Sequence, residues 1–174
     1  MKKKIAILGS TGSIGQSLLE IVNQNRAIFE ISLLTAHKDY KTLLNQAKKF
    51  SVKNLIITDK ESFKKIKKKK INNKIKFFNH FYFLNKILNK KIDYSMSSIV
   101  GINGLEPTLK IIKYSKVIAI ANKESIICGW SLILKELNKN KTKFIPVDSE
   151  HFSLWYGLKN INLSNIEKVY LRSE

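Results

Sequence analysis

The chain has 174 residues, of which 44% are hydrophobic, and a formal net charge of +19. This length is enough for one well-buried core, or for one domain and the start of a second. No apolar run approaches the roughly 18 residues that a membrane span needs, and the apolar part of the N-terminal segment is too short for a signal peptide. The single cysteine, Cys128, excludes an internal disulfide. We therefore expect a globular, cytoplasmic protein that does not bind a membrane.

The positive charge has two interpretations. Clustered Lys and Arg follow phosphate backbones, so nucleic acid is one candidate partner. Lysine supplies nearly all of the charge, however, and arginine occurs only at Arg26 and Arg172. Arginine is the better bidentate ligand for phosphates and bases. We therefore favour a biased amino-acid composition over a nucleic-acid surface and expect no nucleic acid partner.

Apolar, β-prone runs alternate with segments of helical periodicity, which is typical of βαβ units that build a parallel sheet. In the first third we expect strands at 4–8, 29–34 and 54–58, with helices at 13–25 and after a cap at Asp39. The Lys-rich segment 60–91 indicates no clear element. Beyond it we expect strands at 94–100, 117–121, 144–147 and 166–171, and helices at 105–114 and 123–138. The pattern predicts an α/β fold with a Rossmann-like, doubly wound parallel sheet.

A glycine-rich motif, GSTGSIG at 9–15, separates the first expected strand from the first expected helix. It is a variant of the dinucleotide fingerprint, in which bare backbone amides and the helix N-terminus bind a pyrophosphate. Ser10, Thr11 and Ser13 would add hydroxyl donors, and Gly15 would let the helix pack closely on the first strand. The alternative is a tight turn that binds no ligand.

The end of the second expected strand indicates which dinucleotide would bind. NAD sites usually carry Asp or Glu there for the ribose 2′-hydroxyl, whereas this chain has His37 and Lys38. A cation suits the 2′-phosphate of NADP, so we predict NADPH, with Lys38 as the main contact and His37 as a weaker one. A solvated loop is the alternative for both residues. We expect Asp39 to cap the following helix.

The motif ANKES at 121–125 lies where a later strand ends and a helix begins. Open α/β sheets bind ligands at this edge, which would place Asn122, Lys123 and Glu124 near the cofactor. Lys123 could pair with a substrate phosphate or carbonyl, and Glu124 could accept a hydrogen bond from a ribose or an amide. The alternative is a helix start that carries ordinary polar residues.

The motif PVDSEH at 146–151 carries two carboxylates at a strand end. In extended geometry, residues two apart point the same way, so Asp148 and Glu150 could share a hard cation such as Mg²⁺ or Mn²⁺. A third carboxylate or substrate oxygens would have to complete the site, and an ordinary acidic loop is the alternative. We expect His151 to be structural or on the surface, and Cys128 to lie in the core.

Together with SIVGINGLEPTL at 98–109, these motifs resemble the 1-deoxy-D-xylulose-5-phosphate reductoisomerase family in order and spacing. The resemblance runs from residue 4 to about 150, apart from the Lys-rich segment. It implies an oxidoreductase that rearranges its sugar-phosphate substrate with a divalent metal (Mg²⁺, Mn²⁺ or Co²⁺). Reduction by NADPH then gives 2-C-methyl-D-erythritol 4-phosphate. It also implies an NADPH-binding domain over 1–146 and the start of a catalytic domain over 147–174.

The resemblance assigns roles to residues of the motifs. The cofactor would contact Thr11, Gly12, Ser13, Ile14, His37, Lys38, Asp39, Asn122 and Glu124. The catalytic residues would be Lys123, Asp148 and Glu150, of which Asp148 and Glu150 would bind the metal. The substrate would contact Lys123, Ser149 and Glu150. At His37 and Asp39 the family more often has small or neutral residues.

Members of this family continue well beyond 174 residues. The further part supplies a third carboxylate ligand, the residues that bind the substrate phosphate, a mobile lid and a helical C-terminal domain. We therefore expect a fragment that is inactive alone, or a chain whose missing half is supplied in trans, and a homodimer in the full-length family. Two alternatives remain: a non-catalytic dinucleotide-binding module, and a basic nucleic-acid-binding protein built on an old enzyme fold.

Overall fold

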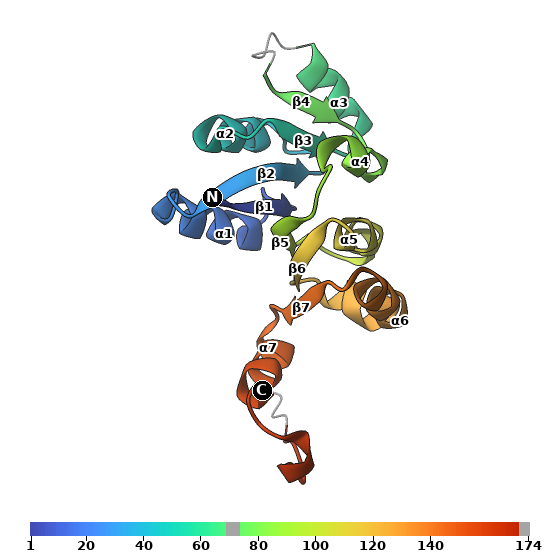
Figure 1. Ribbon diagram of the computed structural model, residues 1–174. Coiled ribbons are helices and arrows are strands. Elements are labelled where there is room, and N and C mark those ends of the chain that lie inside the picture. Colours follow the sequence, from blue (N-terminus) through green and yellow to red (C-terminus); the bar gives the residue numbers. More distant parts are fainter. Residues whose placement is uncertain (69–73, 171–174) are drawn as a thin grey trace.

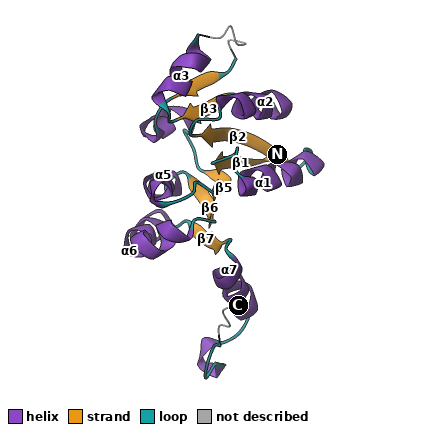
Figure 2. Cartoon of the chain, turned by 180° about the vertical axis from the view of Figure 1, so that it is seen from behind, coloured by secondary structure: helices purple, strands orange, loops and turns teal. Residues whose placement is uncertain are grey.

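The computed structural model describes residues 1–68 and 74–170 and contains a parallel sheet with helices on both faces (Figures 1 and 2). The strands described are β1 (Lys3–Leu8), β2 (Phe29–Ala36), β3 (Asn54–Ile57), β4 (Lys76–Phe78), β5 (Ile92–Ser97), β6 (Ser115–Ile120) and β7 (Lys143–Pro146). They lie in the order β4-β3-β2-β1-β5-β6-β7. The chain order thus reverses at β1, where Ile5 faces Ile31 of β2 and Tyr94 of β5. The predicted Rossmann-like, doubly wound sheet is confirmed, and its switch point lies between β1 and β5.

Two helical layers bury the sheet. The helices are α1 (Ser13–Gln24), α2 (Tyr40–Phe50), α3 (Lys60–Lys67), α4 (Leu84–Ile87), α5 (Leu105–Ile112), α6 (Lys123–Asn140) and α7 (Ser149–Leu158). Short 3-10 turns occupy Phe81–Phe83, Ile102–Gly104 and Leu163–Asn165. Figure 1 shows α1 and α2 on one face of the sheet and α5 and α6 on the other. Alternation along β1 sends Ile7 into the first core and Leu8 into the second, which is why the strand is apolar on both faces.

Side-chain caps fix several helix starts. Asp39 accepts a hydrogen bond from the Thr42 amide at 3.0 Å at the start of α2, which confirms the predicted cap. Asp59, Asn122 and Asp148 cap α3, α6 and α7 in the same way. Such a side chain satisfies an amide that has no partner within the helix. The boundaries of these helices are therefore encoded locally.

The Lys-rich segment contains regular structure that its composition does not indicate. Residue Ile66 of α3 is fully buried although lysines surround it in the sequence, and β4 adds an edge strand beside β3. The lysines of α3 lie toward solvent, so the charge run belongs to an amphipathic helix. Residues 69–73 of this segment lie outside the described residues.

The last part of the chain differs from expectation. Helix α7 follows β7 and extends away from the two layers (Figure 1). A strand was expected at 166–171, but residues 166–170 form neither helix nor strand, and residue 171 lies outside the described residues. A strand needs a neighbour for its backbone groups, and none of the described strands pairs with this stretch. The domain boundary after residue 146 stays a prediction, although β7 ends at Pro146.

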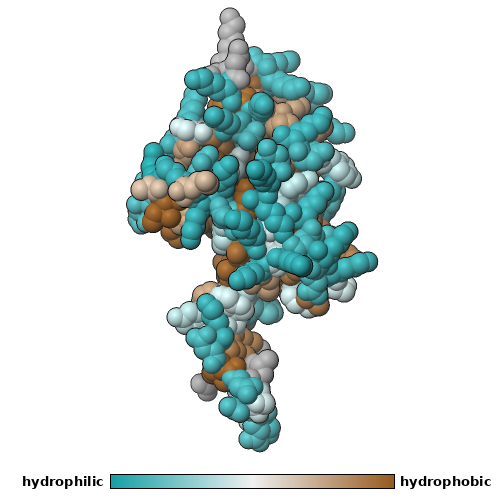
Figure 3. All heavy atoms as spheres, viewed as in Figure 1, coloured by the Kyte–Doolittle hydropathy of each residue, from teal (hydrophilic) through white to brown (hydrophobic). Residues whose placement is uncertain are grey.

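The surface seen in Figure 3 is mainly hydrophilic, with apolar side chains showing on the C-terminal segment. Phe152 and Tyr156 of α7 are 40% and 67% exposed. Cys128, expected in the core, is exposed, because the buried face of α6 carries Ile126, Gly129 and Ile133 instead. Within the described part of the chain, no helix is long and apolar enough to cross a membrane.

Candidate cofactor and metal site

The glycine motif forms a tight turn at the carboxyl end of β1, beside the switch point of the sheet. Gly9 has φ 81°, and a Cβ placed there would lie 2.8 Å from the Ser98 carbonyl oxygen. A Cβ at Gly15 would lie 2.5 Å from the Gly9 carbonyl oxygen, so the first turn of α1 touches the loop as closely as backbone allows. The predicted close packing at Gly15 is therefore present, and it is directed against the loop that ends β1.

The N-terminus of α1 is open to a ligand. No side chain caps it, and its N-cap residue is Gly12. The first amides of a helix have no partner within the helix and carry the positive end of the helix dipole. Gly12, Ser13 and Ile14 are exposed around this end, and Thr11 is half-buried. The Gly12 amide donates to the Gly9 carbonyl oxygen at 3.1 Å, so the main-chain amides of Thr11, Ser13 and Ile14 are the ones that can meet an anion here.

Ser10 has a different environment from the rest of the motif. It is fully buried, and its hydroxyl donates to Oε1 of Gln46 at 2.8 Å. Its amide donates to the carbonyl oxygen of Thr35 at 2.9 Å. In contrast to our expectation, the Ser10 hydroxyl faces the protein and is not available to a phosphate.

The segment after β2 lies at the same edge of the sheet. His37, Lys38 and Asp39 are all exposed there. The ring nitrogen Nδ1 of His37 lies 2.8 Å from the Thr58 hydroxyl. Hydrogen bonds from the side chain and the amide of Thr42 hold the pKa of Asp39 below its usual value, so this carboxylate is committed to the start of α2.

Asn122 connects the turns that follow β5 and β6. Its side chain is 3% exposed, accepts from the Ser125 amide at 2.6 Å, and donates to the carbonyl oxygens of Ile99 and Gly101. These contacts hold the ANKES motif against the segment that follows β5. Its role toward the cofactor stays a prediction, because its described side-chain bonds all go to the protein backbone. The next two residues, Lys123 and Glu124, form the exposed first turn of α6.

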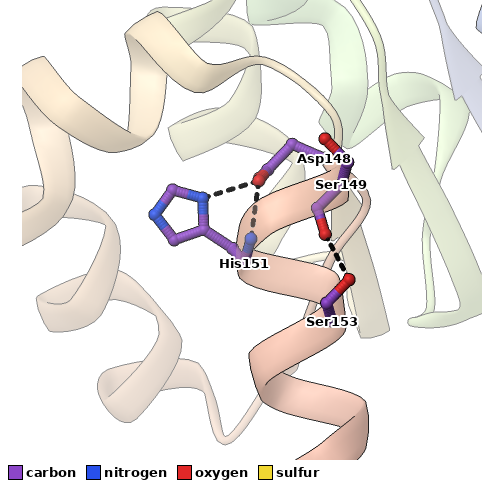
Figure 4. Close-up of polar contacts among 4 residues, drawn as sticks. All are labelled: Asp148, Ser149, His151 and Ser153. Carbon is purple, nitrogen blue, oxygen red and sulfur yellow. Dashed lines mark hydrogen bonds and ion pairs between the residues drawn. The ribbon is translucent and has the colours of Figure 1, made fainter. Parts of the chain in front are cut away.

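Asp148 is the most informative residue of the PVDSEH motif (Figure 4). It is 8% exposed, and its Oδ1 accepts from the His151 amide at 2.8 Å and lies 2.7 Å from Nδ1 of the same residue. A carboxylate oxygen accepts, so Nδ1 is the donor. The other oxygen, Oδ2, is buried and has no hydrogen-bond partner among the described residues. A buried oxygen in this state is suited to bind a cation or a ligand donor.

Sequence reasoning missed the part that His151 plays. We placed it as a structural or surface residue, and its side chain is indeed half-exposed. Its ring and amide nevertheless orient Asp148, so it acts on a candidate metal ligand. The signal was present in the spacing, because a cap residue binds the amide three positions later.

Asp148 and Glu150 do not lie on one extended strand, in contrast to our expectation. Glu150 belongs to the first turn of α7, so the alternation of an extended strand does not apply to this pair. Ser149 is the first residue of α7, and its carbonyl oxygen accepts from the Ser153 hydroxyl at 2.6 Å (Figure 4). Among the side chains that the structure describes, which do not include that of Glu150, no three His, Cys, Asp or Glu gather as a metal site. The roles of Ser149 and Glu150 therefore stay predictions.

Comparison with known proteins places this arrangement in a family. The family model described as 1-deoxy-D-xylulose 5-phosphate reductoisomerase matches residues 5–129. A relative of that name from Pelagibacter ubique (strain HTCC1062) is 59% identical over 171 residues, which are 97% of this chain and 44% of the relative. The chain thus spans less than half the length of the curated relatives it matches.

Solved structures of proteins with the same name also match this chain. The reductoisomerase from Zymomonas mobilis in complex with NADPH matches with a TM-score of 0.79 at 30% identity, over 87% of this chain and 40% of that one. A DOX-P reductoisomerase in complex with NADPH, fosmidomycin and magnesium matches with a TM-score of 0.77 at 30% identity, over 86% and 37% of the two chains. On its sequence, fold and motifs, this chain belongs to the 1-deoxy-D-xylulose 5-phosphate reductoisomerase family.

Proposed function

We propose that this chain binds NADPH and contributes metal and substrate contacts to the conversion of 1-deoxy-D-xylulose 5-phosphate to 2-C-methyl-D-erythritol 4-phosphate. The observation that carries the proposal is the uncapped N-terminus of α1 at the end of β1, next to the switch point of the sheet. The relative from Zymomonas mobilis was solved with NADPH, which supports the same cofactor here. The chain is the dinucleotide-binding part of this activity.

The residues present fit the cofactor. Gly12 carries no side chain, so a pyrophosphate could approach it closely and meet the amides of Thr11, Ser13 and Ile14, while the Gly12 amide donates to the Gly9 carbonyl oxygen. Lys38 would supply the cation for the 2′-phosphate, while His37 and Asp39 would flank the adenosine side. Lys123 and Glu124, in the first turn of α6, would lie beside the nicotinamide and hold substrate and cofactor respectively.

The residues also fit a divalent cation in part. Asp148 offers a buried carboxylate oxygen that has no partner among the described residues, and its other oxygen is fixed by His151. Glu150 would supply a second oxygen ligand, and Ser149 would contact the substrate. When bound, Mg²⁺ or Mn²⁺ would stabilise negative charge on neighbouring substrate oxygens as a Lewis acid. A hard cation needs about six oxygen ligands, so further groups have to complete the site.

The remaining length of the relatives would provide those groups. We propose that the chain is inactive alone and becomes active when the rest of the enzyme is supplied, in cis or in trans. We also propose a homodimer as the complete assembly and the cytoplasm as its location. A substrate that carries phosphate suits the lysine-rich composition.

Complementation tests this proposal. The chain is joined to the portion of the Pelagibacter ubique relative that it does not match, and NADPH oxidation is followed with the sugar phosphate and Mg²⁺. We expect turnover, and we expect Asp148→Asn to reduce it by at least the ~100-fold that disturbed metal surroundings can cost. The affinity for NADPH should not change, because asparagine still caps α7.

Asp93 provides a matched control. Its carboxylate lies near the start of β5, at the opposite edge of the sheet, where it pairs with Lys116. Asp93→Asn should therefore keep full turnover. Full turnover in the Asp148→Asn protein would remove Asp148 from the metal site, and a joined protein that binds NADPH but never turns over would contradict the proposed reaction.

A further inference from the structure

Each polar group of Ser10, namely the amide, the hydroxyl and the carbonyl, makes a hydrogen bond. Its amide donates to the Thr35 carbonyl oxygen at 2.9 Å, and its hydroxyl donates to Gln46 Oε1 at 2.8 Å. Its carbonyl oxygen accepts from Gln46 Nε2, also at 2.8 Å. The preceding residue is held in the same way, because the Gly9 amide donates to the Thr35 hydroxyl at 3.0 Å. Two buried side chains, Thr35 and Gln46, therefore fix the first half of the glycine turn.

The orientation of the Gln46 amide follows from chemistry. A carbonyl oxygen can only accept, so the group that meets the Ser10 carbonyl must be the NH₂ of Gln46. The oxygen of Gln46 then faces the Ser10 hydroxyl, which donates to it. Gln46 is 9% exposed and Thr35 is 1% exposed, so water cannot readily replace either contact.

We propose that Gln46 and Thr35 are positioning residues for the dinucleotide site. The inference rests on the proposed NADPH function. Ser10 directly precedes Thr11, so fixing Ser10 sets the direction in which the next amides and the start of α1 present themselves. A loop that is fixed before the ligand arrives does not have to be ordered on binding, and this raises affinity. Neither residue touches the cofactor itself.

The position of Gln46 also connects two parts of the site. It lies on α2, the helix that begins directly after His37, Lys38 and Asp39. The two hydrogen bonds between Gln46 and Ser10 therefore connect the glycine turn to α2, the helix that follows the segment proposed to lie beside the adenosine. Because the pyrophosphate is common to both dinucleotides, loss of this connection should weaken NADPH and NADH to the same extent.

Titration of the whole chain with NADPH and with NADH tests the inference. Gln46→Met keeps the length of the side chain and removes both hydrogen bonds to Ser10. We expect the Kd for each dinucleotide to rise on the order of tenfold, with an unchanged ratio between the two. Thr35→Val removes the acceptor for the Gly9 amide, keeps the shape of a strand residue, and should give the same pattern.

Thr142 provides the control for a purely structural effect. Its buried hydroxyl lies 2.9 Å from the carbonyl oxygens of Ile112 and Ser115, at the edge of the sheet away from the glycine turn. Thr142→Val should lower the midpoint of thermal unfolding while leaving both Kd values unchanged, in titrations well below that midpoint.

The outcomes separate the two proposals. Wild-type Kd values in the Gln46→Met and Thr35→Val proteins, when the wild type binds NADPH, would overturn the positioning role and leave the proposed function intact. A rise in Kd for Thr142→Val equal to that for Gln46→Met would also overturn it, because the effect would then be general. A wild-type chain that binds neither dinucleotide would overturn the proposed function and the positioning role with it.

Discussion

Three neighbouring residues after β2 have different physical roles. His37 is bonded to the Thr58 hydroxyl, and Asp39 accepts hydrogen bonds at the start of α2. The carboxylate of Asp39 is therefore turned toward the helix it caps, where it repels an incoming phosphate less than a free carboxylate would. Lys38, exposed between them, is the residue best suited to a 2′-phosphate.

Removal of the Lys38 charge should change cofactor preference. We expect Lys38→Ala to raise the Kd for NADPH about tenfold more than the Kd for NADH, because only NADPH carries the phosphate. Lys41→Ala, which removes an exposed charge from the first turn of α2, should leave the ratio of the two Kd values close to that of the wild type. Fluorescence titrations with both dinucleotides measure this ratio, and equal losses of affinity in the Lys38→Ala protein would refute the assignment.

For single residues, the sequence predicts which positions have a structural or functional role better than it predicts the direction of their side chains. Gly9, Gly15 and the Asp39 cap follow from local backbone rules, and the structure agrees with those rules. The burial of Ser10 depends on Gln46, which lies 36 residues later in the chain. The orientation of Asp148 depends on a helix that the expected strand geometry did not include. Side-chain directions set by distant partners are not encoded in a local motif.

The junction between the glycine turn and α1 is the element on which the proposed cofactor site depends. The turn leaves β1 with a left-handed residue at Gly9, and α1 then packs against it through Gly15. No side chain can be added at Gly15 without displacing backbone, since the Ser10 Cα would lie 2.6 Å from a new Cβ. Gly12 is different, because a Cβ there would meet only the Gly9 carbonyl oxygen, at an ordinary 3.5 Å.

Alanine at these two positions should therefore have unequal effects on stability. We expect Gly15→Ala to lower the free energy of unfolding by about 1–3 kcal/mol, the usual cost of overpacking. Gly12→Ala should lower it by only a few tenths to about 1 kcal/mol, as for other changes at an N-cap. Urea unfolding curves of the two variants and the wild type measure the difference. An equal loss in both variants would contradict the close contact at Gly15.

Elements with strong periodicity or a cap are the ones that the sequence predicts well. The helix after Asp39 and the strands on either side of β1 are of this kind. The segment 60–91 is not, because lysine masks the amphipathic pattern of α3, in which Ile66 alone is fully buried. The stretch 166–170 has the composition of a strand and no partner strand among those described, and pairing is a property of the sheet.

For the whole molecule, the strand arrangement and the net charge favour different partners: the first favours a dinucleotide, and the second favours anions in general. Because β1, β2, β5 and β6 are neighbours and run parallel, their carboxyl ends lie at one edge of the sheet, and the predicted cofactor residues follow these ends. The net charge of +19 comes mainly from lysine, and the face seen in Figure 3 is mainly hydrophilic. Net charge attracts anions without selecting among them, whereas uncapped amides at the start of a helix favour a phosphate group. The alternation of strands and helices was sufficient to predict this architecture, because parallel strands require helical crossovers.

Calorimetric titration of the chain with NADPH, for the wild type and for Gly12→Asp, tests the central claim that main-chain amides at the start of α1 bind a dinucleotide. Aspartate is a good N-cap and fits the φ of −78° at this position, so the variant should fold. Its carboxylate would occupy the same amides and repel a pyrophosphate. The account predicts saturable one-to-one binding by the wild type and an affinity at least about 100-fold weaker for the variant. Equal binding by both proteins, or no saturable binding by the wild type, would contradict it.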